Sequence, residues 1–307
     1  MSKILITAKN MPDLDGVSSM VAYKELLQEL NPSNTYFTGE IYQSQPEARF
    51  VVDFLKTKEE TAYLKWDEVI LVDASSTVGL RTDFVPTQVI EVIDHRFLES
   101  VNILAKRFPN AKIQNENVGV AVTLVVEKFL AMSRVPKEKT SKLILAAIYS
   151  HTQNLSSEIL TDRDVAILNY IKSTYEFDLE FIRQMFEFKT EYALRNLKTV
   201  LFDNGKIEDL RYFRLSALQV EVMGDEILNS KADILQILAE YNRKNDLSMG
   251  FVNIIDMQNK ITYLITNDDT LKEVFTKELG FEFTQYLGKF EGLMLRKHIL
   301  AKLNSKR

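Results

Sequence analysis

The chain has 307 residues, of which 46% are hydrophobic, and its formal net charge at neutral pH is -5. This length favours two domains over a single core, and the negative charge excludes broad, sequence-independent binding to nucleic acid, which requires a strongly cationic surface. The sequence contains no cysteine, so disulfides, thiolate metal sites and a cysteine nucleophile are excluded, which fits a reducing compartment.

The N-terminal segment MSKILITAKN contains a short apolar run that soon meets polar residues. The run is too short for a signal peptide or a membrane span. We therefore expect a cytoplasmic protein without a membrane partner, and we predict that the run is a buried first strand.

Three runs rich in β-branched residues, at positions 3–7, 69–72 and 89–93, predict buried strands in the first hundred residues. Segments with helical periodicity are expected at 17–30, 119–132, 137–150 and 162–173. This alternation of strands and helices predicts an α/β domain with a parallel sheet and flanking helices.

The pattern changes beyond about residue 190. Charged, helix-forming residues at 186–201 are followed by strand-like runs at 212–222, 248–255 and 261–266. We predict a smaller second α+β domain and place the domains at 1–190 and 191–307. No linker rich in proline or glycine marks this boundary, which a helical connector would explain.

Carboxylates follow each of the three predicted strands of the first domain. Asp13 and Asp15 follow the first strand, Asp73 the second, and Asp94 with His95 the third. Ligands of open parallel sheets bind beyond the carboxyl ends of the strands. Clustered carboxylates repel one another unless a cation joins them, and oxygen with imidazole suits manganese, magnesium, cobalt or zinc. The pattern predicts a divalent metal site.

Each carboxylate also has a simpler structural interpretation. A single Asp after a strand, such as Asp73 or Asp94, is often a helix N-cap or a turn residue, and an Asp-x-Asp pair can be a surface turn. The combination favours function, because Asp15 and Gly16 begin an apolar-striped helix directly behind a buried strand. No glycine-rich loop follows the first strand, so a P-loop or dinucleotide-binding site is excluded.

Four segments occur in the order and approximate spacing of the DHH phosphoesterase motifs: NMPDLDGVSS at 10–19, Val72-Asp73, Asp94-His95-Arg96 and Ser150-His151-Thr152. Between the last two, ENVGVAVTL at 116–124 resembles the family's glycine-bearing loop and helix. In the second half, LQVE at 218–221 and LRK at 295–297 resemble the signatures of the DHHA2 domain, found in type II inorganic pyrophosphatases, exopolyphosphatases and Prune proteins. The chain therefore resembles this branch of the superfamily, with a DHH domain at 1–190 and a DHHA2 domain at 191–307.

The resemblance implies two metal positions bridged by Asp73. One position would use Asp15, Asp73, His95 and the fourth-motif residue, here His151. The family usually has Asp at that last position, and an imidazole nitrogen can preserve ligation. Mn²⁺ is the expected ion, with Co²⁺ or Mg²⁺ as alternatives.

The other implied position departs from the family pattern. It would use Asp13, Asp73 and a first-motif His, but Lys9 stands where that His is expected. A protonated lysine cannot bind a cation. Lys9 is expected instead to place a fixed positive charge against Asp13.

The third motif also differs, because Arg96 replaces the second His of the usual Asp-His-His, as it does in Prune-type members. A guanidinium can bind phosphate oxygens bidentately. The residues expected to bind substrate phosphate are Lys9, Arg96, Arg296 and Lys297.

Two further roles are implied for carboxylates of the motifs. Asp13 would orient the attacking water or help to bind a second, weaker ion, and Asp94 would orient the ring of His95. With Arg96, these residues form the predicted catalytic set.

The implied reaction is hydrolysis of a phosphoanhydride by a metal-activated water. Pyrophosphate and short-chain polyphosphate are the preferred substrates, with cyclic dinucleotides or short oligonucleotides as an alternative. The substitutions at Lys9, Arg96 and His151 leave open a degenerate paralogue that binds phosphate compounds in a regulatory role. The sequence also leaves a homodimer open.

Overall fold

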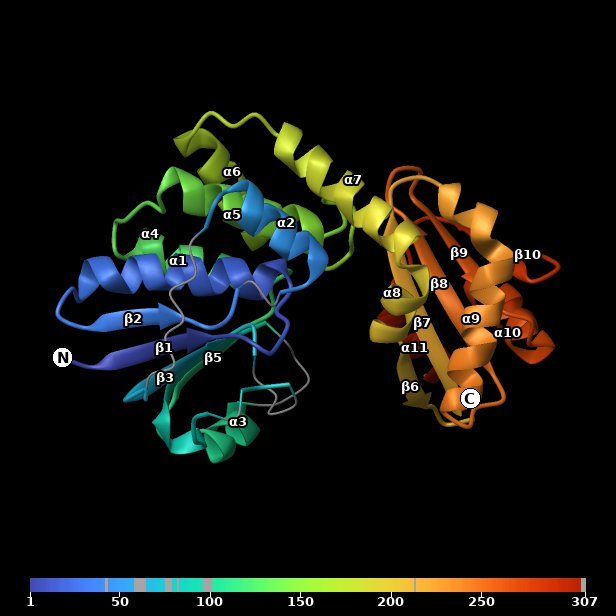
Figure 1. Ribbon diagram of the computed structural model, residues 1–307, viewed down its shortest axis with the longest axis horizontal. Coiled ribbons are helices and arrows are strands. Elements are labelled where there is room, and N and C mark those ends of the chain that lie inside the picture. Colours follow the sequence, from blue (N-terminus) through green and yellow to red (C-terminus); the bar gives the residue numbers. More distant parts are fainter. Residues whose placement is uncertain are drawn as a thin grey trace. The chain divides into compact units, whose positions relative to one another are not determined.

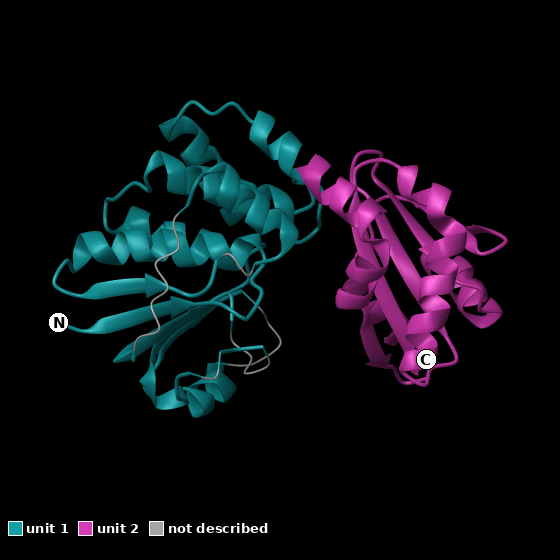
Figure 2. Ribbon diagram, in the orientation of Figure 1, with its two compact units in different colours: residues 1–185 teal, residues 186–307 magenta. Residues whose placement is uncertain are grey.

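The computed structural model describes residues 1–41, 44–57, 65–74, 79–81, 83–95, 101–212 and 214–304. The chain divides into two compact units, residues 1–185 and 186–307 (Figure 2). Among the described helices, none is long and apolar enough to cross a membrane.

The first unit is built on a five-stranded parallel sheet with the order β2-β1-β3-β4-β5. The strands are β1 (Lys3–Thr7), β2 (Thr35–Thr38), β3 (Glu68–Val72), β4 (Val89–Asp94) and β5 (Lys112–Asn115). The three strands predicted from apolar runs are the central strands, and the predicted parallel sheet is confirmed. Because β1 lies between β2 and β3, the strand order reverses there, and ligands of such sheets bind at this reversal.

Helices cover the sheet on both faces, with α1 along one face and α3 beyond the other (Figure 1). The helices of this unit are α1 (Leu14–Leu30), α2 (Pro46–Phe54), α3 (Val101–Arg107), α4 (Ala121–Ala131), α5 (Glu138–His151) and α6 (Asp162–Thr174), with a short 3-10 helix at Pro86–Gln88. α1 is buried along most of its length because α4 and α5 pack against it.

Close packing at Gly16 brings the start of α1 onto the sheet. A Cβ atom at this position would lie 3.0 Å from Cβ of Ala8 and 3.4 Å from Oδ2 of Asp73. A larger residue would therefore push the first turn of α1 away from the ends of β1 and β3.

The second unit contains a mixed six-stranded sheet with the order β10-β11-β9-β8-β7-β6, in which only β7 and β8 pair in parallel. Its strands are β6 (Lys206–Asp209), β7 (Arg214–Val222), β8 (Gly250–Asp256), β9 (Ile261–Ile265), β10 (Glu282–Thr284) and β11 (Leu287–Glu291). Its helices are α8 (Leu197–Asp203), α9 (Lys231–Lys244), α10 (Asp269–Leu279) and α11 (Arg296–Asn304), with a 3-10 helix at Glu226–Ser230. The predicted α+β class is confirmed. Helix α7 (Glu180–Arg195) runs across the division between the units.

Candidate metal centre

The predicted carboxylates and histidines meet at the carboxyl edge of the first sheet. Asp15 is in the first turn of α1, Asp73 directly follows β3, Asp94 ends β4 and His151 ends α5. Two groups of candidate ligands form there, Asp15 with His95 and His151, and Asp73 with Asp94 and His95. Within each group the ligand atoms lie within 4.8 Å of one another.

The ring of His95 is shared by both groups. Its Nδ1 lies 3.0 Å from the carbonyl oxygen of Val118, and because a carbonyl only accepts, Nδ1 carries the proton and donates. The other nitrogen, Nε2, lies 3.5 Å from Oδ1 of Asp73 and 3.7 Å from Oδ2 of Asp15. It is buried and has no hydrogen-bond partner among the described residues.

These separations match those between ligands of one ion. Two ligand atoms about 2.1 Å from an ion and about 110° apart lie roughly 3.4 Å from each other. The donor set of each group, carboxylate oxygen with imidazole nitrogen, also suits a divalent cation.

The carboxylates change the proton affinity of His95. Burial lowers the pKa of the His95 imidazole, but Asp73, Asp15 and the Val118 carbonyl raise it by more, to about 9. A divalent ion at Nε2 must therefore displace a proton at neutral pH.

Asp15 is held by the first turn of α4. Its Oδ2 accepts a hydrogen bond from the backbone N–H of Ala121 at 2.7 Å, and its Oδ1 accepts one from Val122 at 2.9 Å. The N-terminus of a helix favours an anion, although burial raises the pKa of Asp15. Oδ1 also accepts from the Ser19 hydroxyl at 3.4 Å, whereas Oδ2 keeps a further lone pair that a cation can use.

Asp73 adopts an uncommon backbone conformation, with φ of +49°. Its N–H donates to the carbonyl of Ile93 at 2.9 Å, which keeps it in register with β4. Left-handed backbone at a non-glycine residue is costly and occurs disproportionately at functional sites. Its carboxylate lies against His95, with 3.5 Å between Oδ1 and Nε2.

Lys9 and Asp13 form an ion pair at the same edge, with 3.0 Å between Nζ and Oδ2. The other oxygen of Asp13 caps α1 by accepting from the N–H of Gly16 at 3.2 Å. Burial raises the pKa of Asp13, but the Lys9 ammonium and neighbouring His151 lower it by more, so it lies well below its usual range. Among the described residues, Asp13 belongs to neither group of candidate ligands.

Asp94 contacts the backbone of His95 rather than its ring. Its Oδ1 accepts from the His95 N–H at 2.7 Å, whereas the Val118 carbonyl orients the imidazole. Oδ2 of Asp94 is buried without a hydrogen-bond partner in the described part of the chain. Arg96, predicted to bind phosphate, lies outside the described residues.

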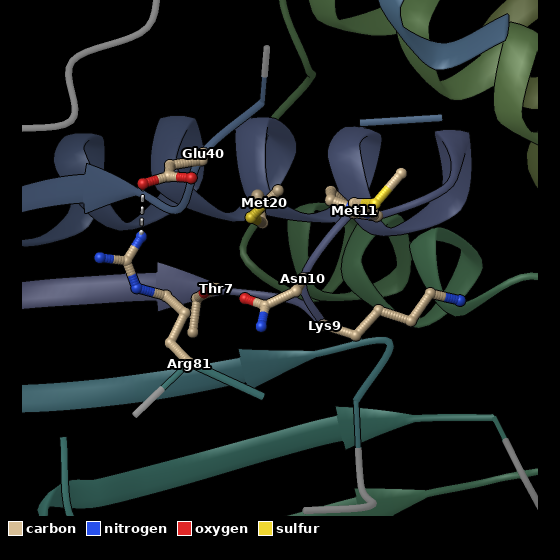
Figure 3. Close-up of a pocket in the computed structure, with 8 residues that line it drawn as sticks. Thr7, Lys9, Asn10, Met11, Met20, Glu40 and Arg81 are labelled. Carbon is tan, nitrogen blue, oxygen red and sulfur yellow. Dashed lines mark ion pairs between the residues drawn. The ribbon is translucent and has the colours of Figure 1, made fainter. Parts of the chain in front are cut away.

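A small pocket lies beside this edge (Figure 3). Its volume of ≈ 20 Å³ has room for about one water molecule rather than a phosphate chain. Arg81 lies 3.7 Å from Glu40 and 2.6 Å from Asp83, and the Lys9 side chain runs away from Arg81 in this view. Arg81 was not predicted to line a pocket, because it lies in none of the sequence motifs.

Arg296 and Lys297 begin α11 in the second unit. The Arg296 guanidinium donates to the carbonyl of Ala217 at 2.9 Å and also to the carbonyl of Asn204. Burial lowers the pKa of Arg296. Lys297 is exposed, and partial desolvation still lowers the pKa of its ammonium. Arg296 thus also connects elements of its own unit.

Comparison with known proteins agrees with the motifs. The family model described as "DHH family, N-terminal domain" matches residues 3–152. A manganese-dependent inorganic pyrophosphatase of Methanothrix thermoacetophila is 24% identical over 312 residues, covering 98% of this chain and 97% of that protein. A probable manganese-dependent inorganic pyrophosphatase of Bacillus cereus is 24% identical over 285 residues, covering 87% and 84%. The crystal structure of a putative family II inorganic pyrophosphatase from Methanococcus jannaschii shares the fold, with a TM-score of 0.69, 20% identity and 98% of each chain covered.

Proposed function

The DHH family model matches residues 3–152, within the first unit, and from this match we propose that the chain is a metal-dependent hydrolase of phosphoanhydride bonds. Inorganic pyrophosphate or short-chain polyphosphate is the substrate. The observation that carries this proposal is that Asp15 and Asp73 both lie against the buried Nε2 of His95. His95 also belongs to both groups of candidate ligands, one with Asp15 and His151 and the other with Asp73 and Asp94.

Mn²⁺ is the proposed ion, with Co²⁺ or Mg²⁺ as alternatives. Asp15, Asp73, His95 and His151 hold it. Carboxylate and imidazole ligands suit Mn²⁺, and the relatives named above are manganese-dependent. When bound, the ion lowers the pKa of a water molecule and neutralises phosphate charge.

We assign one tightly held ion to each chain. The Lys9 ammonium already pairs with Asp13, so it supplies the positive charge that a second ion would bring. Substrate phosphate oxygens bind this ammonium. Arg96, Arg296 and Lys297 are further proposed phosphate-binding residues, each on the basis of the motif that contains it. Asp13 orients the attacking water and Asp94 keeps the backbone of His95 in place.

Phosphate release tests the proposal. Pyrophosphate, tri- and tetraphosphate, nucleotides and cyclic dinucleotides are each incubated with Mn²⁺, Co²⁺ or Mg²⁺. We expect release from pyrophosphate or a short polyphosphate with Mn²⁺, and its loss in Asp73→Asn. Asn is chosen as the replacement because it keeps the shape of Asp and tolerates the left-handed backbone at this position.

A non-hydrolysing phosphate-binding protein is the second candidate. The Lys9–Asp13 ion pair favours this second candidate, because the pair occupies a carboxylate that the resemblance assigns to a metal ion. Calorimetric binding of pyrophosphate without phosphate release from any compound would establish this role and overturn the first proposal. Release from cyclic dinucleotides alone would instead assign a phosphodiesterase.

A further inference from the structure

A buried carboxylate outside the metal centre, Asp164, accepts four hydrogen bonds. Its Oδ2 accepts from the backbone N–H and the hydroxyl of Thr161, at 2.8 and 2.6 Å, and from the N–H of Gly119 at 2.8 Å. Its Oδ1 accepts from the hydroxyl of Thr123 at 2.7 Å. The side chain is fully buried, and these bonds offset the cost of burying its charge.

Only some of these hydrogen bonds cap the N-terminus of α6. Thr161 and Asp164 form a capping box, in which each side chain satisfies the other residue's backbone N–H. Capping does not require the bonds from Gly119 and Thr123, which lie 45 and 41 residues away in sequence. Asp164 therefore joins α6 to the segment that leads into α4.

This segment, residues 118–122, contacts two candidate metal ligands. The Val118 carbonyl accepts from the ring of His95, and the N–H groups of Ala121 and Val122 donate to Asp15. The segment sets the ring orientation of one ligand and the position of the other without contributing a ligand of its own.

Gly119 lies in the middle of this segment and allows the close approach of Asp164. A Cβ atom at Gly119 would lie 2.7 Å from Oδ2 of Asp164 and 2.8 Å from the carbonyl oxygen of Ile159. Any side chain would collide with the carboxylate and with backbone. The contact therefore depends on both residues.

We propose that Asp164 is a positioning residue of the metal centre: it holds segment 118–122 so that His95 and Asp15 present their ligand atoms to one ion. This inference rests on the proposed metal-dependent function. Without the carboxylate, the segment loses its bond to α6 at Gly119, and Thr123, directly after it, loses a second bond. A shift of about 1 Å would then break the Val118 contact to the ring and leave the buried charge of Asp15 uncompensated.

Calorimetry with Mn²⁺ on the full chain tests the proposal. Asp164→Ala should weaken Mn²⁺ binding by about 10- to 100-fold, the range found when groups that orient metal ligands are removed. The matched control is Thr161→Ala, which removes the capping hydroxyl but keeps the bond from Gly119 to Asp164. It should lower thermal stability yet leave Mn²⁺ affinity within about twofold of the parent.

Asp164→Asn separates geometry from charge. The amide oxygen can accept the three bonds made to Oδ2, while the NH₂ group donates to the Thr123 hydroxyl, which can act as an acceptor. This variant should bind Mn²⁺ within about threefold of the parent, because the segment keeps its position. If Asp164→Ala does not fold by circular dichroism, Gly119→Ala takes its place, since the added Cβ displaces the same segment.

Equal weakening by Asp164→Ala and Thr161→Ala would reduce the role of Asp164 to helix capping and overturn the inference. Unchanged affinity in Asp164→Ala, or in Gly119→Ala as its substitute, would also overturn it. A parent protein that binds Mn²⁺ without hydrolysing any phosphate compound contradicts the proposed function alone. A parent protein that binds no divalent ion contradicts both.

Discussion

At the candidate metal centre, the side chains could be predicted from the sequence, whereas the backbone contacts could not. Asp15, Asp73, His95 and His151 could be singled out because carboxylates and imidazoles follow strands or occupy motif positions. The Val118 carbonyl has no such signature, because every residue carries one. Its role depends on how the chain returns to the sheet edge.

Asp164 illustrates a second limit at the residue scale. In the sequence TDRD it is indistinguishable from an ordinary capping residue, and it does cap α6. Its bonds to Gly119 and Thr123 arise only when α6 packs beside α4. Long-range contacts of this kind cannot be deduced from local spacing.

Exchanging Lys9 tests the number of metal ions. Lys9→His removes the ammonium from Asp13 and adds an imidazole, so calorimetry should detect a second Mn²⁺-binding event. Lys9→Met removes the charge without adding a ligand and should keep one ion per chain. Two tightly bound ions in the parent protein, measured by elemental analysis, would contradict the assignment of a single ion.

The raised pKa of His95 predicts how metal affinity depends on pH. Below its pKa of about 9, the imidazole must lose a proton before it can bind an ion. The apparent Mn²⁺ affinity should therefore rise by close to tenfold per pH unit between about pH 6.5 and 8.5. His298→Gln alters a histidine of the second unit and should leave this slope unchanged. A flat pH profile would show that His95 is not a ligand.

At the scale of elements, apolar runs and helical periodicity located the central structure. The run at Lys3–Thr7 coincides with β1, and the helix expected at 162–173 is α6 within one residue at its end. The strands β2 and β5 were missed, because TYFT and KIQN are short and lack a buried apolar run. Both strands are edge strands that depend on pairing with β1 and β4, which a local sequence pattern does not reveal.

Two helix ends offer a test of backbone strain, because substitutions at them should change the free energy of unfolding in opposite directions. Gly280 ends α10 with φ of +78°, and a Cβ there would meet no atom within 4 Å, so Gly280→Ala changes backbone strain alone. Ser133 follows α4 with φ of +53°. Gly280→Ala should lower the free energy of unfolding by about 1 kcal/mol, and Ser133→Gly should raise it by about 0.5 kcal/mol. Chemical denaturation measures both, and equal signs would contradict the argument.

At the scale of the whole molecule, two layered units could be expected from the change in sequence pattern near residue 190. The division between the units falls at residues 185 and 186, inside α7. A continuous helix carries helix-forming residues throughout, so composition does not mark where one core ends and the next begins.

The proposed phosphate-binding role of the second unit rests on charge. The described edge of the first sheet gathers carboxylates, whereas a pyrophosphate or triphosphate chain carries several negative charges that cations must balance. Arg296 and Lys297 of the second unit are the proposed source. Arg296→Ala would also remove the bonds to the Ala217 and Asn204 carbonyls, so its effect on activity would be mixed with an effect on stability.

Lys297 offers the cleaner test, because its side chain is exposed and its replacement should leave the fold intact. A charge-assisted contact with phosphate contributes about 1.5 to 3 kcal/mol, so Lys297→Ala should raise KM and lower kcat/KM by roughly ten- to a hundredfold. Metal affinity should stay constant, because the proposed metal ligands belong to the first unit. Lys302→Ala, an equal change of charge on an exposed residue of α11, is the control and should leave kinetics within about twofold. If both variants lower kcat/KM equally, Lys297 acts only through the overall charge of α11 and not through contact with phosphate.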